Sequence, residues 1–513
     1  MAIVPRTSIA AIPLVLIPAL GVQQGGFDPS AWVWAGALAA WAGALGLVLS
    51  GTGRLRRDAP WLLAAAALLA WTLASAIWST LPSQSVLEAR RTLVYGAVVL
   101  ALIVLARRHS ARLVLAATHT AITALILYAL ARYLLGPRPF LEFEGHFLSE
   151  PLGYANAVGI LAAMAIILSI GRIADTPSRR GRAALAALVP LLVLALGLTG
   201  SDASWLALVI GLATTAAIDP RRRALGRCIG LVMPAALAAA ALGHLSHLTS
   251  SAASPRIGGI PVLLIALGCA GAAAAMQARA GGTRAVMPSA SAASARRLLV
   301  AGALALAGVA VLGVILGGAT EPRVSYYHVA WHEFLAHPLL GSGAGTFGHA
   351  WLLSGRVVQW GGALDAHSLY LETLAELGPI GLVLLAAFLF YPLGRAVHQK
   401  TLPLAPAAAG ATVAFLLHAG LDWDWELPAV VIAGLACSAA VAFAEPGDAG
   451  EPETAAGPVR TAALAAALLA GAAAIAGARS ATVPSAGPFT NEAPLSGASI
   501  QLGSSETDSY LPL

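Results

Sequence analysis

Long apolar runs alternate with short polar connections along almost the whole chain. A helix that spans a membrane needs about 20 apolar residues, within a range of about 17–25. By that measure, the pattern predicts spans over 8–23, 31–50, 60–78, 92–106, 113–135, 153–170, 184–200, 204–218, 228–247, 257–276, 298–317, 377–393, 404–420, 427–443 and 461–478. Several of these are short, so we expect about 12 core spans and up to 15. The periodicity indicates an all-α fold, a polytopic integral membrane helical bundle.

One long polar segment interrupts this pattern between the apolar runs that end near 317 and begin near 377. We expect it to be a large external loop that contains short helices and the catalytic residues. The pattern thus predicts an N-terminal transmembrane bundle over 1–317, the catalytic loop over 318–376, C-terminal transmembrane helices over 377–443, a cytoplasmic linker over 444–460, an extra span over 461–478 and a disordered tail over 479–513.

Composition supports a membrane protein. Of the 513 residues, 58% are hydrophobic and 11% are charged, whereas soluble domains carry about 25% charged residues. The net charge of +6 does not indicate nucleic acid, because the arginines lie in short loops between apolar runs. The three cysteines lie far apart in apolar runs and suit packing. No P-loop, dinucleotide-binding or HExxH motif occurs, so no cofactor is expected.

The arginine-bearing loops define the orientation. They fall on alternate connections and therefore all lie on one side, which the positive-inside rule identifies as the cytoplasm. Their basic residues are Arg54, Arg56, Arg57, Arg107, Arg108, Arg112, Arg172, Arg179, Arg180, Arg182, Arg221, Arg222, Arg223, Arg227, Arg279, Arg284, Arg296, Arg297, Arg395 and Lys400. The loop over 318–376 is consequently predicted on the outer face, with membrane lipids around the spans.

The end of this loop carries the first candidate for chemistry. Asp365 is predicted to cap a helix that has His367 in its first turn. The helix dipole there favours a nearby anion and keeps a histidine neutral, so His367 could act as a general base beside a phosphate. Tyr370 would lie on the same helical face. The alternative is a histidine at the membrane interface that has no catalytic role.

The same stretch resembles a known family. His367-Ser368, nine further residues and then Gly378-x-x-Gly381 match the His-[Asn/Ser/Gln]-x9-Gly-x-x-Gly pattern of the O-antigen ligase/O-antigen polymerase superfamily. The segment from Trp331 to Phe347, with its Pro-Leu-Leu-Gly-Ser-Gly-Ala-Gly run, is similar to the family's loop. Weaker similarity extends to Trp78-Ser79, to Gly153-Tyr-Ala-Asn156, and to His418 with Asp422-Trp-Asp-Trp-Glu426.

The resemblance implies a metal-independent glycosyltransferase of the bacterial cytoplasmic membrane. Such an enzyme takes a glycan from an undecaprenyl-diphosphate carrier and transfers it, with inversion, to a hydroxyl of a glycan or lipid acceptor on the outer face. The motif histidine, here His367, is the base of the family. Gly378 and Gly381 form its structural motif.

The diphosphate requires cations, and arginine suits it because the guanidinium can bind two oxygens at once. Arg323 matches the family's arginine ahead of an aromatic-rich helix. Its alternative role is an anchor among lipid head groups. Where many members carry a second arginine, this chain has Asp202 in the sequence Thr199-Gly-Ser-Asp. Arg138, Arg256, Arg356 and, preferably, Arg90 and Arg91 are the candidate replacements.

Other polar residues have weaker roles. Tyr154 and Asn156 begin a span and could line the substrate cavity, although Asn156 could equally bond a neighbouring helix. Acidic residues and tryptophans alternate over 422–426. This alternation suits an interfacial aromatic belt with carboxylates facing water, and sugar stacking on tryptophan is the alternative. Gly341, Gly343 and Gly345 predict a tight turn more than a phosphate cradle. His332, His337 and His349 lack the spacing of metal ligands.

Several functions remain open from the sequence. Ligase and polymerase share the motif and differ in the acceptor. A flippase or transporter for the same carrier predicts paired charges near the bilayer midplane and inverted repeats, and the sequence shows neither. A non-catalytic membrane scaffold is the third possibility, because Asp202 replaces the expected arginine.

Overall fold

The computed structural model of the chain describes residues 8–50, 55, 57–106, 110–137, 145–219, 221–250, 258–280, 322–355, 363–398 and 405–444. Its regular elements in these ranges are all helices, in agreement with the expected all-α fold. The α-helices are α1 Ser8–Gly21, α2 Pro29–Ser50, α4 Ala59–Ala74, α5 Pro82–Leu105, α6 Ser110–Leu135, α7 Ala155–Asp175, α8 Arg179–Leu198, α9 Asp202–Ile218, α10 Arg222–Leu245, α11 Gly259–Arg279, α13 Pro322–Ala336, α14 Phe347–Leu353, α15 Leu369–His398, α16 Ala405–Ala419 and α17 Pro428–Ala442. Short 3-10 helices are η1 Gln24–Gly26, η2 Ser75–Ile77 and η3 Asp424–Glu426.

Twelve of the described helices match expected membrane spans, whereas α5, at the expected span 92–106, is not among them. Eight are long and apolar enough to cross a membrane, and four further apolar helices, α1, α9, α16 and α17, are shorter. This agrees with a polytopic bundle of about 12 core spans. The predicted spans over 298–317 and 461–478, the linker over 444–460 apart from Ala444, and the tail lie outside the described residues. Two boundaries differ markedly. Helix α5 begins at Pro82 and thus includes Arg90 and Arg91, and α15 begins at Leu369 instead of 377.

The centre of the bundle consists of α7, α16 and α17, which are buried over nearly their whole length. Small residues let these helices approach closely. At the crossing of α9 and α16, a Cβ atom on Gly410 would lie 2.5 Å from the carbonyl oxygen of Gly211, and one on Gly211 would lie 2.8 Å from that of Gly410. This contact fixes α16, whose last turn leads into the connection over 420–427.

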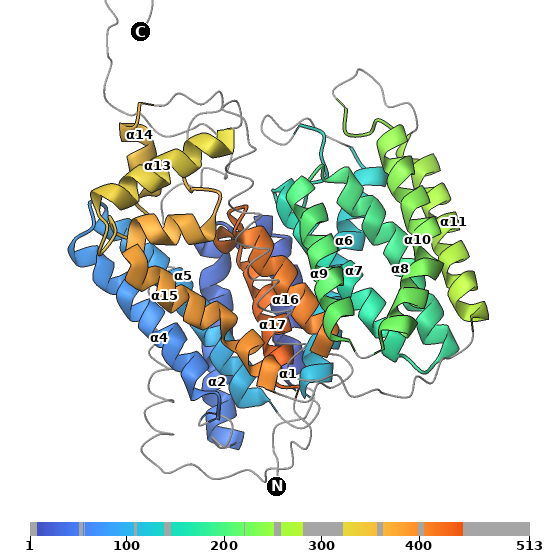
Figure 1. Cartoon of the computed structure of the whole chain (residues 1–513), viewed down its shortest axis with the longest axis horizontal. Helices are drawn as coiled ribbons and strands as arrows, with labels where there is room; N and C mark the ends of the chain where they lie inside the picture. Colours follow the sequence, from blue (N-terminus) through green and yellow to red (C-terminus); the bar gives the residue numbers. More distant parts are fainter. Residues whose placement is uncertain are drawn as a thin grey trace, which may run out of the picture.

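A second apolar cluster covers one end of the bundle (Figure 1). It is formed by α13, α14 and the start of α15, with buried members Tyr326, Val329, Ala330, Phe347, Trp351, Ala363, Ala366 and Ala375. Hydrogen bonds attach it to the spans below: Trp71 Nε1 donates to the Leu377 carbonyl at 2.9 Å, and Ser85 Oγ donates to the Ala344 carbonyl at 2.7 Å. We call this unit, over 322–355 and 363–377, the cap.

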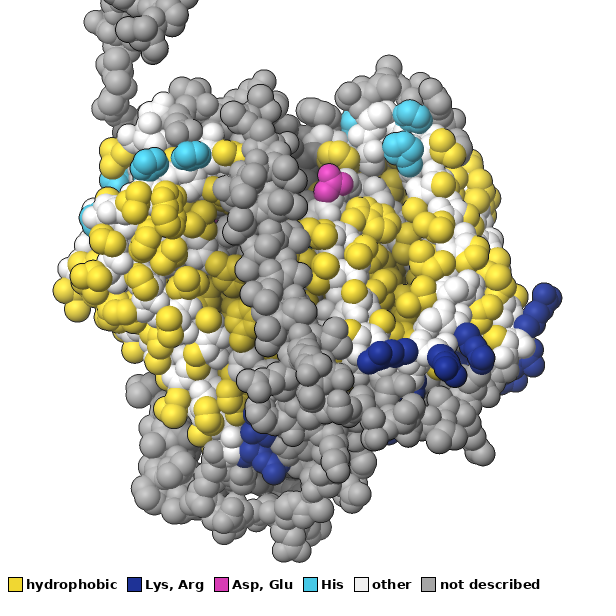
Figure 2. Space-filling view, in the orientation of Figure 1, with side chains coloured by type: hydrophobic (Ala, Val, Ile, Leu, Met, Phe, Trp, Pro, Cys, Tyr) yellow, Lys and Arg dark blue, Asp and Glu magenta, His cyan; other side chains and the backbone are white. Residues whose placement is uncertain are grey.

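Charge separates the two ends of the molecule. Figure 2 shows arginine side chains at the end opposite the cap, whereas histidines lie at the cap end. The intervening surface is largely apolar. This distribution agrees with the alternation of arginine-bearing and arginine-poor loops along the chain.

Candidate active site

His367 lies in the cap, two residues before α15 begins. Its φ angle is 51°, a left-handed conformation that is uncommon for a residue other than glycine. Asp365 stabilises this conformation, because its Oδ1 accepts the backbone N–H of His367 at 2.9 Å. The same oxygen lies 2.8 Å from the ring atom Nδ1, as an ion-pair contact and not as an aligned hydrogen bond. An aspartate that accepts the N–H two residues ahead forms a local turn. The imidazole is therefore held by one carboxylate in a strained backbone conformation.

This geometry corrects two expectations. Asp365 does not cap α15, and His367 does not lie in its first turn, because the helix begins at Leu369. The helix dipole consequently does not keep the ring neutral. Burial alone would lower the pKa of His367, but the carboxylates of Asp365 and Asp422 outweigh burial and raise this pKa. The imidazole is thus a stronger base than the sequence suggested.

The first turns of α13 cover His367 from another side. The ring centroid of Tyr326 lies 4.7 Å from that of His367, and the Tyr327 hydroxyl donates to the His367 carbonyl at 3.5 Å. Arg323 is one helical turn earlier on α13 and is close enough to influence the pKa of His367. The predicted base and the predicted diphosphate ligand therefore lie at the same end of α13.

Asp422 connects three parts of the fold. Its fully buried carboxylate accepts the Tyr154 hydroxyl at 2.7 Å, Asn156 Nδ2 at 2.5 Å, Arg323 Nη2 at 3.2 Å and the Trp423 N–H at 3.0 Å. Burial would raise the pKa of Asp422, but the Arg323 guanidinium, His418, His367 and the Tyr154 hydroxyl lower it. An ionised carboxylate thus joins the start of α7, the start of α13 and the α16–α17 connection.

The expectation of a water-facing acidic belt over 422–426 is wrong. Asp422 and Asp424 are fully buried, and Trp423 packs on Tyr154 with ring centroids 4.5 Å apart. Buried carboxylates require partners because desolvation is costly. Each acidic residue has a different one: Asp422 pairs with Arg323, Asp424 with His418 at 2.6 Å, and Glu426 with Arg91.

A second buried row runs next to Asp422. Asp424 contacts His418 Nδ1, and His418 Nε2 lies 3.0 Å from Ser204 Oγ, which also lies 2.8 Å from Ser201 Oγ. The order of groups resembles a catalytic triad, but all of these side chains are buried, so the row joins α9 to the α16–α17 connection. Asp202, beside it at the start of α9, is exposed and forms no ion pair with the described residues.

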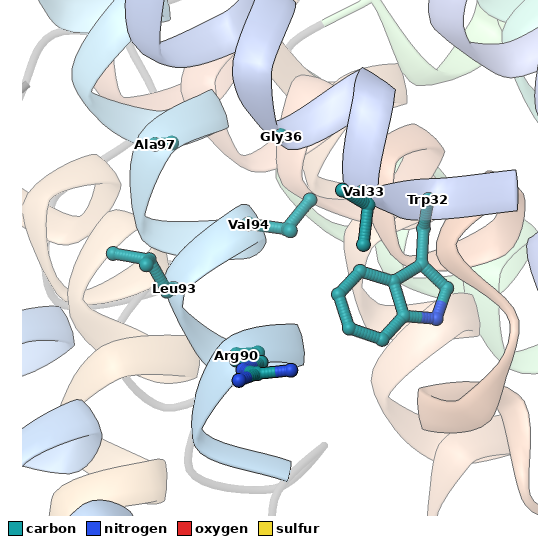
Figure 3. Close-up of a pocket in the computed structure, with 7 residues that line it drawn as sticks. All are labelled: Trp32, Val33, Gly36, Arg90, Leu93, Val94 and Ala97. Atoms are coloured by element: carbon teal, nitrogen blue, oxygen red, sulfur yellow. The ribbon is translucent and has the colours of Figure 1, made fainter. Parts of the chain in front are cut away.

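Arg90 and Arg91 have different surroundings. The Arg91 guanidinium contacts Glu426 and, at 3.0 Å, Glu88, and its side chain is 6% exposed. Arg90 lies at a narrow pocket between α2 and α5, where it faces Trp32 and otherwise apolar side chains (Figure 3). A diphosphate would have to displace carboxylates from Arg91 but not from Arg90. Three other candidates, Arg138, Arg256 and Arg356, lie outside the described residues.

Two further candidates have structural partners. The Tyr370 hydroxyl donates to the Leu416 carbonyl at 2.7 Å and thereby joins α15 to α16. Asn156 bonds Asp422 and the Tyr154 hydroxyl at the start of α7, which places it beside Arg323 through their shared carboxylate. Among the described residues, no group of three or more His, Cys, Asp or Glu side chains could hold a metal ion.

The glycine-rich turn over 341–345 supports the cap. Gly341, Gly343 and Gly345 have φ angles of 72°, 109° and 73°. The N–H groups of Gly345 and Phe347 each donate to the Glu376 carboxylate at 2.8 Å, and that of Gly343 donates to the Glu376 carbonyl at 2.8 Å. These donors are occupied by protein acceptors, so the segment is a tight turn, as predicted.

Gly378 and Gly381 allow the turn to pack against α15. Gly378 has φ 67° and ψ −174°, which breaks the helix, and a Cβ atom there would lie 2.4 Å from the Leu339 carbonyl oxygen. A Cβ atom on Gly381 would lie 2.2 Å from that of Leu377. The motif glycines thus permit a kink where the cap meets the membrane-spanning part of α15.

One comparison with known proteins finds a family match within the chain. Residues 186–386 match the family model described as O-antigen ligase. The chain carries an O-antigen ligase domain. This confirms the resemblance to that superfamily, although no curated protein matches the chain.

The matched segment contains only part of the site. Arg323, His367 and the glycine motif fall inside the O-antigen ligase domain, whereas Asn156 and Asp422 fall outside it. The alternation of Asp422 with tryptophans predicts a surface residue, whereas the structure buries it. The useful signal was its nearness to His418 in a chain with few charged residues, since a carboxylate beside a buried polar residue is often paired.

Substitution of Gly343 tests the turn of this O-antigen ligase domain. An alanine Cβ would lie 2.4 Å from Ser79 Cβ, at a φ angle that disfavours side chains. We expect Gly343→Ala to destabilise the fold by about 1–3 kcal/mol, measured as a lower midpoint of thermal unfolding in detergent. Gly355→Ala is the matched control, because φ is 65° there but nothing lies within 4 Å of the added Cβ. Equal shifts in both variants would contradict the steric argument.

Proposed function

We propose that the chain transfers a glycan from an undecaprenyl-diphosphate carrier to an acceptor hydroxyl, with inversion and without a metal ion, on the outer face of the bacterial cytoplasmic membrane. The family match supports a membrane enzyme of the O-antigen ligase type. The observation that carries the proposed chemistry is the placement of His367, Arg323 and Asp422 at one end of α13. A base, a cation and a buried carboxylate that binds the cation lie together there.

In this proposal His367 accepts the proton of the acceptor hydroxyl. The hydroxyl oxygen forms a bond to the anomeric carbon, while the bond from that carbon to the phosphate oxygen breaks and the diphosphate leaves with the electron pair. Attack opposite the leaving group inverts the anomeric configuration. Because Nδ1 faces Asp365, Nε2 is the nitrogen that takes the proton, and the Asp365 carboxylate then stabilises the imidazolium.

Arg323 suits the diphosphate because its side chain is 35% exposed while Asp422 holds one end of the guanidinium. Charge-assisted hydrogen bonds to phosphate oxygens strengthen as negative charge develops on the leaving group. Arg90 is the second cation that this proposal favours.

The alternatives differ in what they predict for purified protein. A ligase and a polymerase of this superfamily use the same transfer chemistry and differ in whether the acceptor is a lipid or a growing glycan. A flippase moves the carrier without breaking the glycosyl–phosphate bond. A scaffold does neither.

Reconstitution in liposomes with an undecaprenyl-diphosphate glycan and candidate acceptors tests the proposal. We expect release of undecaprenyl diphosphate, an acceptor product whose anomeric configuration is inverted when determined by NMR, and the same rate in EDTA. Intact carrier recovered after incubation with both classes of acceptor would contradict it. Retention of configuration, or loss of activity in EDTA that zinc or magnesium restores, would contradict the mechanism.

The pH dependence tests Asp365. Only neutral His367 can accept a proton, so transfer should fall as pH falls through the raised pKa of this histidine. In Asp365→Asn the largest charge that raises this pKa is removed, so the acidic limb of the kcat profile should move to lower pH. The maximal rate should also fall, because the ring loses its ion pair. Asp202→Asn, which removes an exposed carboxylate, should leave the limb in place, and a limb that does not move in Asp365→Asn would disprove the assignment.

A further inference from the structure

α13 has two faces of opposite character. Tyr326, Val329 and Ala330 are buried in the cap. On the opposite face, Trp331 is 47% and Leu335 is 54% exposed. Large apolar side chains at this exposure are not explained by packing within the chain.

The exposed apolar surface continues beyond the end of α13. Leu339 and Leu340, in the turn that follows, are 75% and 42% exposed. The Leu339 carbonyl packs against Gly378, directly before the part of α15 where Ile380 and Val383 are 45% and 66% exposed. Since α15 is one of the helices that can cross a membrane, exposed apolar side chains lie on both sides of this contact, on a membrane-spanning helix and on the cap.

The composition of the α13 face fits a lipid interface. Apart from Ala336, which lies beyond the histidine edge, the exposed positions between Trp331 and Leu340 hold tryptophan, leucine, proline and histidine, and no charged Lys, Arg, Asp or Glu. His328 and His332 lie along one edge, with ring centroids 6.1 Å apart. Figure 2 shows the same order in space, with an apolar surface that extends up to histidines at the cap end. Tryptophan and leucine below, and polar side chains above, are typical of helices that lie in the head-group region.

We propose that the face of α13 formed by Trp331 and Leu335, together with Leu339 and Leu340 of the next turn, rests in the outer leaflet of the membrane that the chain spans. The occupant is phospholipid, because the surface adjoins exposed apolar side chains of the membrane-spanning α15. A second copy of the chain would not need this adjacency. The arrangement fixes the height of α13, and with it Arg323 at its first turn, relative to the lipid head groups.

Spin labels on single cysteines test this placement in liposomes made from bacterial phospholipids. The parent carries Cys269→Ser and retains the buried Cys228 and Cys437. Labels are placed at Leu335→Cys and Leu339→Cys. Val383→Cys is the lipid reference on α15, and Ala336→Cys is the water reference, since Ala336 is exposed on the same turn beyond the histidine edge.

Accessibility to oxygen and to a water-soluble nickel chelate gives the depth of each label. We expect the oxygen-to-nickel collision ratio at positions 335 and 339 to approach that of position 383 and to exceed that of position 336 several-fold. A ratio equal to that at 336 would place this face in water and overturn the proposal. Low collision rates with both reagents would also overturn it, because protein would then cover the face. Since the measurement requires no turnover, its failure is distinguishable from failure of the proposed transferase activity.

Discussion

Replacement of His367 by alanine is expected to reduce glycan transfer by about 10²–10⁴-fold, the usual contribution of a general base. The imidazole is held by Asp365 and covered by Tyr326, and no other described histidine shares this environment. The loss should appear in kcat, because proton transfer occurs in the transition state. Single-turnover release of undecaprenyl diphosphate in liposomes measures it directly.

Two variants separate chemistry from folding in this experiment. His367→Asn keeps a residue that tolerates the left-handed backbone at φ 51° and cannot act as the base, so it should be as inactive as alanine and fold like the wild type. His332→Ala removes an exposed histidine of α13 and should leave the rate unchanged. A His367→Asn variant that transfers glycan within a few-fold of the wild-type rate would exclude His367 as the base.

The fold followed largely from the apolar pattern, because a spanning helix requires a length of apolar chain that no other element of this sequence needs. The apolar pattern was misleading where charged side chains lie on a helix of the bundle. The start of α5 was predicted near 92 because Glu88, Arg90 and Arg91 are charged, but Arg91 is paired with Glu88 and Glu426 and can therefore lie on a helix within the bundle. Hydropathy alone does not register such pairing.

The site could be predicted only in part, for a related reason. The histidine motif is local, so His367 and Gly378 were identifiable from the resemblance of this stretch to the family's pattern. The partners of Asp422 are distant in sequence: Tyr154 is separated from it by 268 positions, Asn156 by 266 and Arg323 by 99. Nothing in the local sequence distinguishes a carboxylate buried by such partners from one that faces water between two tryptophans.

The turn before α15 shows the same limit on a smaller scale. Helix rules placed Asp365 at the cap of the helix, whereas its side chain bonds the backbone of His367 and forms a turn of its own. An aspartate side chain can either cap a helix or close a local turn of its own. Which of the two forms here depends on how α13 packs against this segment. The raised pKa of His367, opposite in direction to what a helix dipole would cause, follows from that choice.

Substitution of Asp422 by asparagine should weaken the site through two measurable effects. Oδ1 accepts from Tyr154 and Trp423, and Oδ2 accepts from Asn156 and Arg323. In either orientation of the asparagine side chain, its NH2 group would therefore face hydrogen-bond donors. A buried donor without a partner costs about 1–3 kcal/mol, which should lower the thermal midpoint. Arg323, released from its anchor, should bind the diphosphate less well and raise KM for the donor by about 10-fold or more, since a charge-assisted hydrogen bond contributes about 1.5–3 kcal/mol.

The pH profiles of Asp422→Asn and Arg323→Ala should move in opposite directions. Asp422 raises the pKa of His367 and Arg323 lowers it, so the acidic limb of kcat should shift to lower pH in Asp422→Asn and to higher pH in Arg323→Ala. Arg323→Lys retains the positive charge and should keep the limb near its wild-type position while KM still rises, because lysine cannot bind two oxygens in a planar geometry. A general loss of structure would lower activity at every pH without this opposition. Shifts in the same direction in both variants would therefore show that Asp422 and Arg323 do not act on His367 as a connected pair.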